Sequence, residues 1–146
     1  MRRKNIKLRV NNLVKKYGTA IPWQLAQDLG ILIVTAPLPN SIRGHFSRPL
    51  RKKVITLNAD LDDREINIVI AHELGHATMH SMSDYTFHAD SINFINARTE
   101  YEANLFALYL LSYSYDIDER LLQSAPRYRD LMTYREAHEL LCRCVE

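Results

Sequence analysis

The segment REINIVIAHELGHATMH at 64–80 most constrains the fold, because it carries the motif H-E-x-x-H within a helical pattern. Asp62 lies just before it and Glu65 follows three residues later, which predicts a capped helix start. Residues four apart in a helix lie one turn apart on one face. We therefore expect His72 and His76 to point toward one common position.

Two imidazoles in this arrangement are typical of a metal site. Zinc is the expected ion, because neutral imidazole nitrogens bind it and a catalytic zinc site has three protein ligands and a water. Glu73 lies beside the first ligand, where it can take the proton of that water. The motif can also arise by chance in a chain with six histidines, so the interpretation requires a third ligand.

His80 is a poor candidate for the third ligand. It lies eight residues beyond His72, about 12 Å along the helix axis, so we expect it to be a polar residue at the helix end. The metzincin form of the motif would require Gly at position 79 and His at position 82. Both positions are Met, which excludes that class.

A second long helix, predicted over 98–113, offers two carboxylates, Glu100 and Glu102. They differ by about 200° in helical direction, so only one can face the metal. Glu100 shares its face with Ala103, which permits close helix approach, and with Asn104, which can hydrogen-bond a liganding imidazole. We favour Glu100 as the third ligand, with Glu102 as the alternative. If neither binds a metal, both are expected to be surface carboxylates.

The residues before the motif predict two helices and a small sheet. The first helix, basic and amphipathic, is expected over 5–17 with Gly18 as its stop, and the second between Pro22 and Gly30, so the pair could resemble a helix-turn-helix. Three β-rich runs predict a sheet of about three strands, the last two joined as a hairpin. These runs cover residues 31–35, 44–46 and 53–58.

The rest of the chain predicts a loop or broken segment over 81–97 and shorter helices near 118–124 and 130–143. The expected fold class is therefore α+β. A length of 146 residues fits one domain, so residues 1–146 are expected to form a single domain.

Composition is that of a globular protein, with 47% hydrophobic and 25% charged residues. No apolar run is long enough to cross a bilayer and the N-terminus lacks the pattern of a signal peptide, so we expect a cytoplasmic protein without membrane contact. Of the 19 basic and 17 acidic residues in the chain, twelve basic residues and one acid lie at or before Lys53. The rest of the chain has seven basic and sixteen acidic residues. Two solvated faces of opposite charge explain this better than a face for an anionic partner.

Cys142 and Cys144 are too close in sequence for an ordinary structural disulfide, so free thiols are expected. His138 and Cys142 have helical i,i+4 spacing, but two ligands do not make a metal site.

The motif AHELGH at 71–76, followed by EYEANLFA at 100–107, resembles the ImmA/IrrE family of zinc metallopeptidases. Members carry H-E-x-x-H and then E-x-x-A-N-x-F-A on the next helix. YGTAIPWQLAQDLGI, the Gly44 strand and KVITLN resemble the family's N-terminal part, so the resemblance covers most of residues 10–113. The chain departs after the second helix, where it reads LLSY and many relatives read LLMP.

The resemblance implies a gluzincin-like fold with a zincin-type active-site helix. It also implies His72, His76 and Glu100 as zinc ligands, Glu73 as base and acid, and Asn104 in the position often held by a supporting Asp. In this family, enzymes encoded beside phage or mobile-element repressors cleave those repressors. The implied partner is thus a helix-turn-helix repressor of a phage or mobile element, and the implied activity that of a zinc metalloendopeptidase.

Two other functions compete with this one. A protein that binds the repressor without cleaving it would have the same partner. A helix-turn-helix DNA-binding regulator would use the basic first third, but PWQLAQDLG offers no Arg or Lys and carries Asp28, so nucleic acid binding is not expected.

Two parts of the catalytic site stay open. The oxyanion donor could be any of Tyr85, His88 and Tyr101. A substrate could add as a strand to an edge near His45–Phe46 or Val54–Leu57.

Overall fold

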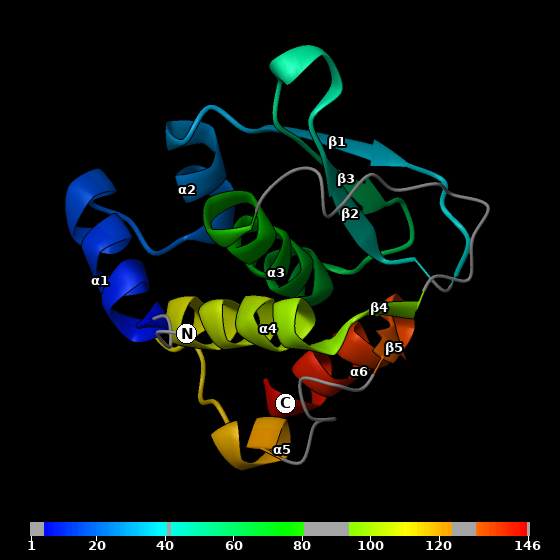
Figure 1. Cartoon of the computed structure of the whole chain (residues 1–146). Coiled ribbons are helices and arrows are strands. Elements are labelled where there is room, and N and C mark those ends of the chain that lie inside the picture. Colours follow the sequence, from blue (N-terminus) through cyan, green and yellow to red (C-terminus); the bar gives the residue numbers. More distant parts are fainter. Residues whose placement is uncertain (1–4, 41, 81–93, 124–130, 146) are drawn as a thin grey trace.

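The computed structural model (Figure 1) describes residues 5–40, 42–80, 94–123 and 131–145, with 94–97 and 131–135 described by their backbone alone. The elements in chain order are α1 (Ile6–Tyr17), α2 (Pro22–Asp28), β1 (Leu32–Ala36), β2 (Gly44–Ser47), η1 (Pro49–Arg51), β3 (Val54–Asn58), α3 (Asp63–Met79), β4 (Phe94–Asn96), α4 (Ala97–Leu111), α5 (Glu119–Gln123), β5 (Leu131–Thr133) and α6 (Tyr134–Cys144). The α+β class is confirmed.

The helix α3 runs through the centre of the molecule. Its start is the predicted capping box: Asp62 Oδ1 accepts a 2.8 Å hydrogen bond from the Glu65 amide, and the Glu65 carboxylate accepts one from the Asp62 amide. Every residue from Ile68 to Ala77 is buried. A helix covered on all sides takes its polar side chains into the interior, where they need partners.

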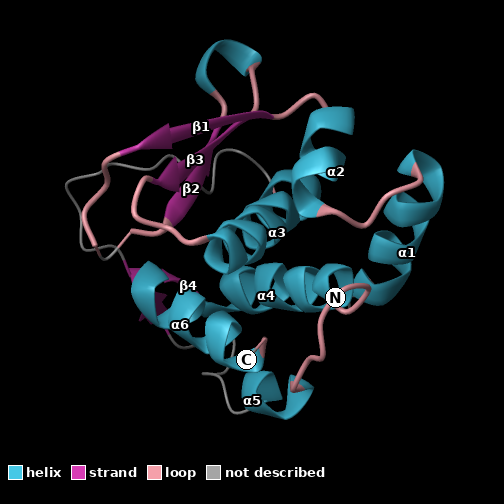
Figure 2. Cartoon of the chain, turned by 180° about the vertical axis from the view of Figure 1, so that it is seen from behind, coloured by secondary structure: helices cyan, strands magenta, loops and turns pink. Residues whose placement is uncertain are grey.

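The helix α4 packs directly on α3 and lies on the side away from the sheet (Figure 2). Gly75 makes this approach possible, because a Cβ there would lie 3.0 Å from the Cα of Ala103 and 3.1 Å from the Cβ of Phe106. The close contact aligns the second turn of α4 with the motif on α3.

The three-stranded sheet has the order β1-β3-β2, with β1 parallel and β2 antiparallel to β3. The predicted three strands and the hairpin of the last two are confirmed. Gly44 lets β2 lie close to α3, since a Cβ there would collide with Val69. Because β3 is paired on both sides, the expectation that Val54–Leu57 forms an exposed edge is wrong.

The two N-terminal helices form as predicted. The helix α1 starts at Asn5, whose Oδ1 accepts from the Leu8 amide, and ends at Gly18 with φ of 71°. Gly30 follows α2 with φ of 74°. The helix α1 packs mainly on α4, and α2 mainly on α3. Both helices therefore support the central pair rather than each other.

The C-terminal part differs from the prediction at two places. Residues 94–96, expected within a loop or broken segment, form β4, which pairs with β5 in a second, antiparallel sheet. The predicted helix over 130–143 begins at Tyr134, because β5 takes up residues 131–133. The cause is a strand pairing between segments far apart in the sequence, which no local pattern reports. Residues 81–93 of the expected loop lie outside the described part.

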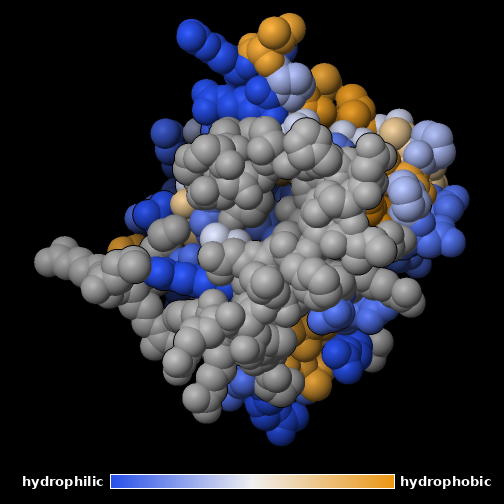
Figure 3. Space-filling view, turned by 45° about the vertical axis from the view of Figure 1, so that its right-hand side comes forward, coloured by the Kyte–Doolittle hydropathy of each residue, from blue (hydrophilic) through white to orange (hydrophobic). Residues whose placement is uncertain are grey.

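No helix in the described ranges is long and apolar enough to span a membrane. On the face shown in Figure 3, the coloured surface is mostly hydrophilic, with apolar residues in separate groups.

Candidate metal centre

The carboxylate of Glu100 lies between the two histidines of the motif. Its Oε2 is 2.8 Å from His72 Nε2 and its Oε1 is 2.7 Å from His76 Nε2, while the two Nε2 atoms are 3.2 Å apart. All three side chains are buried. The structure thus brings together the three residues predicted as ligands.

The donor atoms fit a metal ion better than they fit one another. Neither oxygen of Glu100 has a partner in hydrogen-bond geometry among the described residues, despite the short distances to nitrogen. In a tetrahedral zinc site with bonds of about 2.0–2.1 Å, neighbouring donors lie about 3.3 Å apart, close to the separations here. Donors that converge without bonding directly are suited to share a cation.

Asn104 holds His72 in the orientation that this chemistry needs. Its Nδ2 donates a 3.2 Å hydrogen bond to the carbonyl of Ala137, which leaves Oδ1 to accept a 2.7 Å bond from His72 Nδ1. In the neutral form of His72 the ring proton is therefore on Nδ1, and the lone pair of Nε2 points toward Glu100. The hydrogen bond expected between Asn104 and an imidazole of the motif is present.

Glu73 is buried on the same helix, and its Oε1 is 3.7 Å from Nε2 of His138 on α6. Burial alone would raise the pKa of Glu73, but the nearby imidazole of His138 and the positive charge of protonated histidines around it outweigh burial and lower the pKa. The pKa of Glu100 is also lowered, because the charges of His76 and His72 outweigh its burial. Both carboxylates are therefore ionised at neutral pH.

Comparisons with known proteins show the family of this chain. The model of a peptidase family, M78, described as an IrrE N-terminal-like domain, matches residues 26–140. The chain belongs to the ImmA/IrrE family. A relative, the "Uncharacterized immunity region protein 2" of Bacillus phage phi105, is 37% identical over 106 residues, or 73% of this chain and 67% of the relative. No solved structure matches the chain. Membership in the ImmA/IrrE family implies a metallopeptidase-type enzyme.

His80 differs from the prediction in one respect. It is the C-cap of α3, as expected of a helix-end residue, but its Nδ1 lies 3.0 Å from Nδ1 of His76. It therefore contacts Nδ1 of the candidate ligand His76, as Asn104 contacts Nδ1 of His72. Sequence spacing excluded His80 as a ligand. The i,i+4 spacing within α3 places it beside His76 instead.

Glu102 points away from the three candidate ligands. Its Oε1 is 3.5 Å from His80 Nε2 and 3.8 Å from Arg98 Nε. Glu100 is fully buried and Glu102 is 6% exposed, so the interpretation of both as surface carboxylates is wrong. Glu100 rather than Glu102 faces the histidines.

His138 is the residue of the site that sequence reasoning missed. It lies on the buried face of α6 with Ala137 and Leu141, a helical spacing that the sequence did carry. The described residues contain two groups of three potential metal ligands, and neither includes Cys142. The nominal pair of His138 and Cys142 therefore has no third ligand among the described residues.

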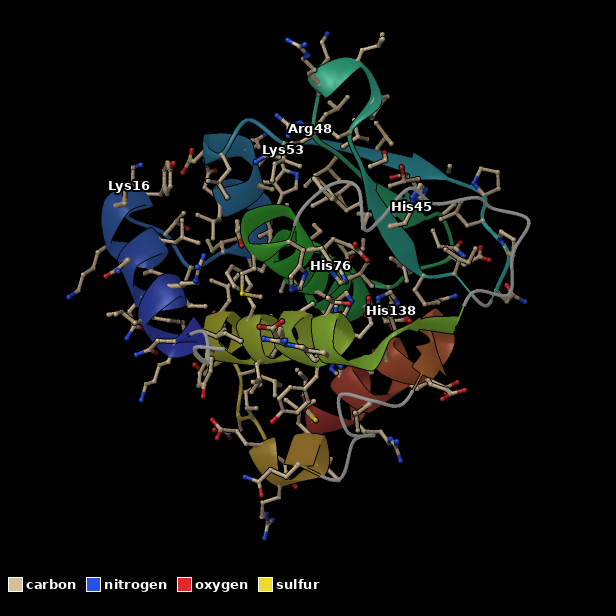
Figure 4. The ribbon with its side chains drawn as sticks, in the orientation of Figure 1. Lys16, His45, Arg48, Lys53, His76 and His138 are labelled. Carbon is tan, nitrogen blue, oxygen red and sulfur yellow. The ribbon has the colours of Figure 1, made fainter. Side chains whose placement is uncertain are left out.

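The remaining candidates for the oxyanion donor are only partly placed. Tyr85 and His88 lie outside the described residues. Tyr101 is half-buried against the hydrophobic core. His45 is half-buried on β2, and burial lowers its pKa more than the negative charge of Glu73 raises it. Figure 4 shows that His45, His76 and His138 come from β2, α3 and α6.

Proposed function

We propose that this chain is a zinc-dependent endopeptidase that cleaves a helix-turn-helix repressor of a phage or mobile element and so relieves repression. One observation carries the proposal: the two oxygens of Glu100 lie 2.8 Å and 2.7 Å from His72 and His76, and Glu73 is buried on the same helix as the histidines. His72, His76 and Glu100 would hold the metal.

Each residue then has a defined part in peptide hydrolysis. A bound zinc ion would acidify a water and polarise the scissile carbonyl. Glu73 accepts the proton of the attacking water and delivers it to the leaving amine nitrogen. Asn104 keeps the proton of His72 on Nδ1, which leaves Nε2 free to serve as a ligand.

The strand β2 is suited to hold an extended substrate. It pairs with β3 on one side, and no strand within the described ranges pairs with its other side. It also packs on α3, which carries the motif. A peptide added along His45 and Phe46 would be bound mainly through its backbone, and the partner would be selected by further contacts.

The choice of a repressor as substrate rests on two supports. The first is the resemblance that the two helical motifs carry. The second is the phage relative, whose name places it in an immunity region. Nucleic acid binding is less well supported, because α1 and α2 pack on α4 and α3 and do not form an independent pair.

Co-expression with a helix-turn-helix repressor encoded beside this gene tests the proposal. Wild type is expected to cleave the repressor, whereas Glu73→Gln is expected to bind zinc but leave the repressor intact. Glu119→Gln, an exposed acid on α5, serves as the control and should cleave normally. If the repressor stays intact in the presence of zinc-loaded wild type, the proposal is wrong. Loss of repression with both wild type and Glu73→Gln would instead favour a binding antirepressor.

A further inference from the structure

His138 lies beside the residue that would activate the water. Its Nε2 is 3.7 Å from Glu73 Oε1, and its ring is 4.7 Å from the ring of His72 at an interplanar angle of 89°. The side chain is 2% exposed. A separation of 3.7 Å is longer than a good hydrogen bond, so both side chains can bond to an atom that enters near them.

The position of His138 is fixed by its helix. Asn104 donates to the carbonyl of Ala137, the residue before His138, at 3.2 Å. Arg64 at the start of α3 donates to the carbonyl of Cys142 at 3.1 Å. The same amide of Asn104 thus positions His72 on one side and the backbone next to His138 on the other.

His138 is not needed as a ligand. His72, Glu73 and His138 also form a group that could hold an ion, and it shares His72 with the group containing Glu100. Asn104 occupies His72 Nδ1, so only Nε2 remains, and one nitrogen lone pair binds one ion. Nε2 of His72 lies against Glu100, so His138 is not one of the three candidate metal ligands.

A cavity of about 770 Å³ has His138 in its lining. Its lining includes Arg43 and Glu65, which form a 2.9 Å ion pair, and Cys142 from the next turn of α6. His138 is the lining residue that also contacts the candidate catalytic centre. His138 therefore lies between this cavity and Glu73.

We propose that His138 is a catalytic residue that donates a hydrogen bond from Nε2 to the oxyanion formed during peptide hydrolysis. The proposal rests on the proposed function. When the water oxygen bonds to the carbonyl carbon, the π electrons of the carbonyl move to its oxygen, and His138 stabilises that charge. The C–N bond then breaks, the carbonyl re-forms, and the proton held by Glu73 goes to the amine. His138 keeps its proton throughout.

Three variants separate this role from a structural one. His138→Phe keeps a ring against His72 but has no donor, His138→Ala removes the ring, and His138→Gln keeps an N–H donor. Loss of one oxyanion donor lowers kcat by roughly 10²–10³-fold. We expect that loss in the Phe and Ala variants, little change in KM, and partial recovery in the Gln variant. Glu136→Gln, an exposed residue of α6, is the control and should behave as wild type.

Two measurements do not depend on the repressor. Zinc content is expected to stay at one ion per chain in every His138 variant, and loss of that ion would make His138 a ligand and overturn the proposal. A phosphonamidate dipeptide, whose tetrahedral oxygens resemble the oxyanion, should bind zinc-loaded wild type roughly 10²–10³-fold more tightly than His138→Phe. Equal affinities would also overturn it. If this difference is found while the repressor stays intact, the proposed substrate fails and the role of His138 stands.

Discussion

Nδ1 of His72 donates a 2.7 Å hydrogen bond to Oδ1 of Asn104, and both side chains are buried. The second hydrogen bond of Asn104, to the Ala137 carbonyl, determines which end of the amide faces the histidine. A residue one helix away from the motif therefore sets the tautomer of a candidate ligand.

Asn104→Ala removes this hydrogen bond, and we expect it to weaken zinc binding by about 10–100-fold. Competition with a chromophoric chelator measures the affinity. Asn104→Asp is the comparison variant, because it keeps an acceptor oxygen for His72, although it loses the donor to Ala137 and adds a negative charge. Zinc affinity equal to wild type in the Ala variant would show that the hydrogen bond does not support a ligand.

Glu100→Ala and Glu102→Ala test the third ligand directly. Glu100 lies within 2.8 Å of both imidazoles, whereas Glu102 faces His80 and Arg98. We expect the first variant to lose stoichiometric zinc and the second to retain it. Elemental analysis of the purified proteins gives the ratio, and the reverse pattern would assign the ligand to Glu102.

Removal of the metal should lower thermal stability. A ligand present at a hundredfold excess over its Kd stabilises the folded state by about 2.7 kcal/mol, which corresponds to roughly 10 °C in Tm for a chain of this size. Calorimetry with chelator and then with added zinc is expected to show this fall and recovery. Glu100→Ala should not respond to either addition. An unchanged Tm in wild type would mean that no ion binds the folded chain.

Gly75→Ala tests the contact that brings the two helices together. The added methyl would meet the backbone of Ala103 at 3.0 Å and 3.1 Å, and backbone cannot move aside cheaply. Overpacking costs about 1–3 kcal/mol, which exceeds the gain of about 1 kcal/mol in helix propensity. Urea denaturation should show net destabilisation and zinc titration weaker binding. Asn12→Ala, an exposed change on α1, should stay within about 0.5 kcal/mol.

The two cysteines should be poor nucleophiles in the folded protein. Burial raises the pKa of both Cys142 and Cys144 above the ordinary thiol value. A raised pKa leaves less thiolate at a given pH, so alkylation by iodoacetamide at pH 8 should be slower than in denaturant and should accelerate as pH rises. Equal rates in the native and denatured states would contradict this.

Local patterns in the sequence were sufficient for much of the fold. The capping box at Asp62 and Glu65 predicted the start of α3, and Gly18 predicted the end of α1, because caps depend on neighbouring residues. The pairing of β4 with β5 was missed, since it joins segments more than thirty residues apart and depends on tertiary packing.

The sequence by itself determined the helical spacing of His72, Glu73 and His76, and it excluded His80 as a ligand, because both follow from the rise and turn of one helix. Only the tertiary structure decided that Glu100 faces the histidines and that His138 meets Glu73. These relationships depend on how α3, α4 and α6 pack. Packing is set by close contacts such as that of Gly75 with Ala103, which no periodicity within a single helix can report.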